Sequence, residues 1–112
     1  MCIGDRAIEA YTLALKEAPG CSAVLRNRAA AHEKMSKWSD VEADASAALK
    51  ADAAAGEPVS AKALLRRAAA LVQLSRVEDA IKAYTAALEL KPPNADAIKE
   101  ALAALKPPPP PS

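Results

Sequence analysis

Apolar residues recur along most of the chain at the spacing of an α-helix. Ile8, Tyr11 and Leu15 are separated by three and four residues, and residues 81–88 repeat that spacing. Because an α-helix completes a turn in roughly 3.6 residues, side chains at this spacing share one face. The pattern therefore predicts amphipathic helices rather than strands, in which apolar residues would alternate with polar ones.

The same local pattern recurs as a long internal repeat. Residues 7–19 return at residues 80–92 with eight of thirteen positions identical. A weaker copy lies between them, displaced by 34 residues from the first and by 39 from the last, and its matching residues are Val41, Ala45, Ala48 and Leu49. A period of about 34 residues is typical of stacked helix-turn-helix units. We therefore predict an all-α fold in which six helices form an antiparallel solenoid.

The remaining helices are expected between and after these copies. Partner helices are predicted at about residues 22 to 35 and 60 to 74, each ending before a polar turn, and Trp38 is expected to pack at the start of its helix. Gly56 and Pro58 predict a lengthened loop between repeats. The expected domain covers residues 1–106 and comprises a partial repeat (1–20), two repeats (22–53 and 60–93) and a C-terminal capping helix (94–106) that closes the solenoid. Asn94 is expected to be the N-cap residue of this last helix, whose apolar face is formed by Ile98, Leu102 and Leu105.

Charge and composition limit the possible partners. The 15 basic and 14 acidic residues leave a net charge of +1. So small a net charge produces no overall electrostatic attraction to nucleic acid or to an anionic membrane. No apolar run is long enough to span a bilayer. Cys2 and Cys21 lack metal-site spacing and are expected to be reduced and buried or incidental, so a cytoplasmic protein is expected. Residues 107–112 are expected to form an extended proline tail.

No catalytic, cofactor or metal site is expected. His32 has no metal-ligating residue at suitable spacing and is interpreted as a packed repeat position. Glu42, Asp44 and Glu78 are expected on wetted helix faces, where no pair stands out as general acid and base. The glycines are isolated and form no phosphate-binding loop. These features predict a binding protein rather than an enzyme.

The repeats resemble the tetratricopeptide repeat family, over nearly the whole chain. Val24–Met35 (VLRNRAAAHEKM) and Ala61–Leu71 (AKALLRRAAAL) resemble the carboxylate-clamp subclass, found in co-chaperones of the seventy- and ninety-kilodalton heat-shock chaperones. The repeat domain at the front of UCS-type myosin chaperones is similar, because it also has an Asn-Arg-Ala-Ala run and a Lys followed four residues later by Arg. Nothing about myosin follows, since their armadillo-like portion is absent here.

The resemblance implies a site for C-terminal peptides of these chaperones that end in aspartate. Asn27 would bind the terminal carboxylate, while Lys62 and Arg66, on one helix face, would hold the aspartate side chain. The groove floor would be formed by Ala30, Leu65, Ala69 and Val72. By contrast, Arg26, Arg28 and Arg67 are expected to be exposed or packed against neighbouring helices.

The family's clamp takes two further residues from the first helix of its first repeat, and the chain begins at about the end of that helix. Ile8, Tyr11 and Leu15 are therefore expected to bury only part of their surface, which leaves a face that could fray or self-associate. Two functions stay open. One is co-chaperone-type peptide binding through the part of the clamp that this chain contains. The other is a structural adaptor that assembles partner proteins without recognising a carboxylate.

Overall fold

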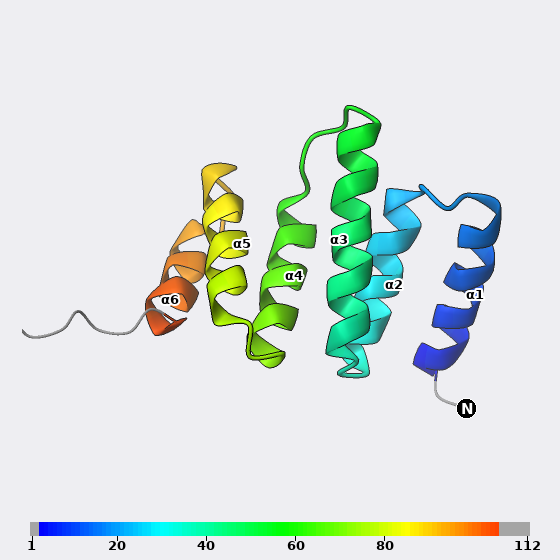
Figure 1. The fold of residues 1–112 in the computed structure, drawn as a ribbon, viewed down its shortest axis with the longest axis horizontal. Coiled ribbons are helices and arrows are strands. Elements are labelled where there is room, and N and C mark those ends of the chain that lie inside the picture. Colours follow the sequence, from blue (N-terminus) through cyan, green and yellow to red (C-terminus); the bar gives the residue numbers. More distant parts are fainter. Residues whose placement is uncertain (1–2, 106–112) are drawn as a thin grey trace, which may run out of the picture.

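The protein forms a single row of α-helices (Figure 1). The computed structural model describes residues 3–105, so Cys2 and the predicted proline tail lie outside the described residues. Its six helices are α1 (Ile3–Glu17), α2 (Ser22–Lys34), α3 (Trp38–Ala54), α4 (Ala61–Gln73), α5 (Val77–Glu89) and α6 (Ala95–Leu105). The predicted all-α fold with six helices is confirmed.

Small side chains let consecutive helices pack closely. Each helix contacts the next one along the chain, and α2 also contacts α4. The residues with no solvent exposure are mostly alanines from α3, α4 and α5, namely Ala45, Ala48, Ala68, Ala70, Ala80 and Ala87. Among the residues whose burial the structure describes, only Leu71 and Val41 are large and fully buried. Much of the core is therefore made of helix backbones in close approach, with few bulky side chains between them.

The turns follow the polar breaks in the sequence. Ser36 and Ser75 take left-handed backbone conformations, with φ of 57° and 63°, two residues after the ends of α2 and α4. Gly56, with φ of 72°, lies in the longer connection from α3 to α4. A glycine tolerates this region without steric cost, which is why the helix can stop there. The Ser60 side chain then caps α4 by accepting a hydrogen bond from the Ala63 backbone N–H at 3.2 Å.

One face of α1 is open among the described residues, where α2 is the only helix whose backbone lies close to that of α1. Ala14 is exposed, although Ala48 and Ala87 are buried at the same repeat position. Ile8 and Tyr11 are half-buried, as expected, and Leu13 is 62% exposed. Leu15 was expected to bury only part of its surface, and this prediction was wrong. Its side chain is only 8% exposed and packs with Leu25 of α2 and Ala48 of α3.

This open face predicts uneven local stability. In the 112-residue chain, backbone amides of residues 7–16 are expected to exchange with solvent faster than those of residues 80–90, because the backbone of α1 has one close neighbouring helix, α2, whereas α5 lies between α4 and α6. Hydrogen exchange in a dilute monomer measures this difference. Equal protection of the two segments would contradict it, and protection of α1 that rises with protein concentration would indicate self-association through this face.

Candidate functional site

The side chains predicted to bind a carboxylate lie partly in one pocket on α4. Lys62 and Arg66 are four residues apart on this helix and line a pocket of about 360 Å³. Leu65 and Ala69, from the predicted floor, line the same pocket, and Glu33 of α2 completes it. The helical spacing explains the grouping, because residues 62, 65, 66 and 69 fall on one side of α4.

The other three predicted site residues lie outside the lining of this pocket. Asn27 is exposed on α2, and Ala30 is half-buried on the same helix. Val72 is half-buried and packs against the core cluster of α4 and α5 that contains Leu71. The structure thus brings Lys62 and Arg66 together in one pocket. Asn27 does not line this pocket, but it lies on α2, which contacts α4.

Arg66 already has an acidic neighbour in the pocket. Its Nε atom lies 3.6 Å from Oε2 of Glu33, a distance of ionic attraction that is too long for a good hydrogen bond. The Arg66 side chain is 30% exposed and that of Glu33 is 42% exposed. Nε itself is buried and has no hydrogen-bond partner. The pocket therefore combines two cations with one carboxylate.

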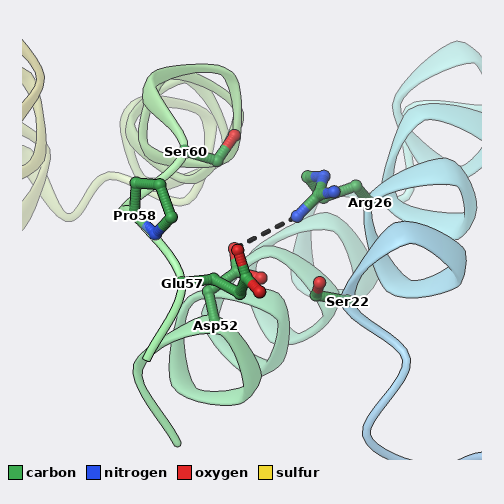
Figure 2. Close-up of a pocket in the computed structure, with 6 residues that line it drawn as sticks. All are labelled: Ser22, Arg26, Asp52, Glu57, Pro58 and Ser60. Atoms are coloured by element: carbon green, nitrogen blue, oxygen red, sulfur yellow. Dashed lines mark hydrogen bonds and ion pairs between the residues drawn. The ribbon is translucent and has the colours of Figure 1, made fainter. Parts of the chain in front are cut away.

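A second pocket, of about 440 Å³, lies where α2 and α4 begin (Figure 2). Ser22 and Arg26 of α2 face the end of α3 and the loop that leads into α4, and the lining is completed by Asp52, Glu57, Pro58 and Ser60. Nη1 of Arg26 lies 3.1 Å from Oδ2 of the buried Asp52. Arg26 is thus neutralised by Asp52, and two carboxylates line this pocket beside a single guanidinium.

Comparison with known proteins identifies the family. A family model for the tetratricopeptide repeat matches residues 61–94. The second such domain of human RPAP3, solved in complex with the HSP70 peptide SGPTIEEVD, is 30% identical and superposes with a TM-score of 0.78 over 93% of this chain and 82% of that chain. The chain belongs to the tetratricopeptide repeat family. The first such domain of Spaghetti (RPAP3), bound to the HSP90 peptide SRMEEVD, is 31% identical, with a TM-score of 0.72 over 89% of this chain and 80% of that one.

Full-length relatives are much longer than this tetratricopeptide chain. RNA polymerase II-associated protein 3 of Mus musculus is 36% identical over 96 residues, and the Homo sapiens protein is 33% identical over the same number. These matches cover 86% of this chain but 14% of each relative. The chain thus corresponds to a small part of those proteins.

Two further arginines stabilise the stack of tetratricopeptide helices. Arg28 donates hydrogen bonds to both carboxylate oxygens of Asp44, at 2.8 and 2.7 Å, and a third to the Thr12 hydroxyl at 3.2 Å. It therefore links α1, α2 and α3. The hydrogen bond to Asp44 raises the pKa of Arg28 above its ordinary value, although burial acts in the opposite direction. Arg67 donates to the Ser46 hydroxyl at 3.0 Å. The prediction that these two arginines are exposed or packed against neighbouring helices is confirmed, since both pack against a neighbouring helix.

The expectation that Asp44 lies on a wetted face was wrong. Asp44 is buried under α2, where Arg28 compensates its charge and Nε2 of His32 lies 3.4 Å from its Oδ2. His32 is itself buried, as its interpretation as a packed repeat position predicted. Of the other two carboxylates, Glu78 is exposed, while Glu42 is half-buried beside Arg67, 3.5 Å from its Nε. Asp44 and Glu42 thus hold helices together through their arginine partners, whereas Glu78 lies on a wetted face as expected.

Sequence reasoning missed Glu33 as a pocket residue, although the repeat contained a signal. The 39-residue displacement that superposes the second and third repeats places Asn27 on Arg66 and Ala30 on Ala69. It also places Glu33 on Val72, a residue predicted to line the groove. Comparing every groove position across repeats would therefore have found the acidic residue.

Other kinds of site find no support in residues 3–105. No group of three or more His, Cys, Asp and Glu side chains in this part of the chain could hold a metal ion. No helix in the same segment combines the length and the apolar character that crossing a membrane requires. The pocket beside Lys62 and Arg66 therefore remains the best candidate site of the described residues.

Proposed function

We propose that this tetratricopeptide chain binds C-terminal peptides that end in aspartate. Lys62 and Arg66 would hold the aspartate side chain, and Asn27 would donate a hydrogen bond to the terminal carboxylate. The observation that carries the proposal is the single pocket lined by both cations beside Leu65 and Ala69. Charge-assisted hydrogen bonds to carboxylates are stronger than neutral ones, and two attachment points select the chain end over internal aspartates.

The relatives support a particular class of partner. The peptides named with the two solved RPAP3 domains, SRMEEVD from HSP90 and SGPTIEEVD from HSP70, both end in Glu-Glu-Val-Asp. We therefore propose the C-terminal tails of these chaperone classes as partners, in a role of binding without catalysis. The free thiol of Cys21 fits the reducing cytoplasm that the sequence predicts.

The likeness to UCS-type myosin chaperones is a narrower prediction that rests on two short sequence features. These are the run from Asn27 to Ala30 and the spacing of Lys62 and Arg66. RPAP3 is similar over far more of the chain, since its second domain covers 93% of it. We therefore use peptides of the RPAP3 type as the first probes of binding.

An adaptor without carboxylate recognition is the second candidate function. It is favoured by the Glu33 carboxylate, which lies 3.6 Å from Arg66 in the pocket and offsets part of its positive charge. An adaptor of this kind would use the outer helix surfaces and would not distinguish a free C-terminus from a blocked one. Peptide binding separates the two functions directly.

Replacing Arg66 with alanine is expected to weaken binding of Met-Glu-Glu-Val-Asp by roughly tenfold to a hundredfold, because one charge-assisted hydrogen bond contributes about 1.5 to 3 kcal/mol. Lys62→Ala is expected to have an effect of similar size. Isothermal titration calorimetry with the free-acid peptide measures both.

Lys82→Ala is the matched control, since Lys82 is exposed on α5 and does not line the pocket. The amidated peptide removes the terminal carboxylate and is expected to bind more weakly to the wild type. Equal affinity of the wild type and Arg66→Ala for the free-acid peptide would rule out the clamp and leave the adaptor function.

A further inference from the structure

Glu33 is an acidic side chain in a pocket that is proposed to bind an acid. It belongs to α2, lines the pocket with Lys62 and Arg66 of α4, and places Oε2 3.6 Å from Nε of Arg66. At 42% exposure its carboxylate is reached by solvent and by any molecule that enters the pocket. Glu33 is therefore part of the surface that a bound peptide meets.

Glu33 and a bound peptide carboxylate would share the positive charge of Arg66. A guanidinium has five N–H donors, and Glu33 lies on the Nε side, which leaves the two terminal nitrogens for an incoming carboxylate. A peptide aspartate bound there would place a second negative charge within several ångströms of Glu33. Like charges at such short range repel each other even near a protein surface, where screening is partial.

Further acidic residues in the peptide increase this repulsion. An extended chain advances about 3.3 Å per residue, so side chains two and three residues before the terminus lie roughly 7 to 10 Å from it. That distance is close to the Debye length of about 8 Å at physiological ionic strength. Carboxylates at these positions still sense Glu33, whereas amide side chains of the same shape do not.

We propose that Glu33 is a specificity-determining residue of the groove. It lowers the affinity for tails with acidic residues before the terminal aspartate, including the chaperone tails proposed above as partners, relative to tails whose preceding residues are neutral. This proposal rests on the proposed peptide-binding function. It predicts a charge preference that the arrangement of Lys62 and Arg66 alone would not produce, because those two cations attract every added carboxylate.

The test compares two peptides on two proteins. Glu33→Gln removes the charge but keeps the shape of the side chain, and the peptides are Met-Glu-Glu-Val-Asp and Met-Gln-Gln-Val-Asp. The substitution is expected to raise affinity for the Glu-Glu peptide by about three- to tenfold, and for the Gln-Gln peptide by a clearly smaller factor. Glu100→Gln is the matched control, since it makes the same charge change at an exposed position of α6 that does not line the pocket.

The outcomes separate this proposal from the one on which it depends. If the wild type binds and Glu33→Gln leaves affinity unchanged, lowers it, or raises it equally for both peptides, Glu33 does not set specificity, and peptide binding stands. An equal gain from Glu100→Gln would show a general charge effect and would likewise overturn the role of Glu33. If neither peptide binds the wild type or Glu33→Gln, both proposals are wrong.

Discussion

Asp44→Ala is expected to lower the free energy of unfolding by about 3 to 5 kcal/mol, as is typical when one partner of a buried ion pair is removed. Asp44 is buried and accepts two hydrogen bonds from Arg28, at 2.8 and 2.7 Å. Without it, the Arg28 guanidinium remains between helices with no anionic partner. Because the Arg28 side chain is 22% exposed and can recover some hydration, the lower end of the range is expected.

Urea unfolding followed by circular dichroism measures this loss. Asp79→Ala is the matched control, since Asp79 pairs with Arg76 at 2.9 Å on the surface, where such pairs contribute about 0 to 1 kcal/mol. The double variant Arg28→Met, Asp44→Leu should recover stability relative to Asp44→Ala, because it leaves no unpaired charge. If Asp44→Ala and Asp79→Ala cost the same, the pair between α2 and α3 does not stabilise the stack as argued.

Leu71→Ala is expected to destabilise the fold by about 2 to 5 kcal/mol. Leu71 is fully buried on α4, and the other buried members of its cluster, Ala68, Ala80 and Ala83, are all alanines. Alanine side chains cannot move into the space that the leucine would leave. The resulting cavity therefore persists, and its cost adds to the lost transfer free energy of the leucine.

The same unfolding experiment with Leu13→Ala provides the control. Leu13 is a leucine on α1 with 62% exposure, so its truncation should change stability by less than about 0.5 kcal/mol. A loss below about 1 kcal/mol for Leu71→Ala would indicate that the alanine-rich core can collapse around the missing side chain, contrary to the expectation from its close packing.

The helices and their order were determined by the sequence alone because their signals are local. Helix α4 was predicted at about residues 60 to 74 and occupies Ala61–Gln73. The Gly56 and Pro58 loop lies between α3 and α4 as predicted, since these residues restrict their own backbone wherever they occur. Lys62 and Arg66 were predicted on one face because a spacing of four residues defines a face in any helix.

Only the tertiary structure decided which charges meet. Asp44 was expected in water and is buried, because Arg28 reaches it from 16 residues away across the packed helices α2 and α3. Glu33 reaches Arg66 between α2 and α4, a contact that no periodicity within either helix encodes. Leu15 is buried by residues of α2 and α3 for the same reason. Helical periodicity specifies which side of a helix a residue occupies, but the packing of neighbouring helices determines what lies opposite that side.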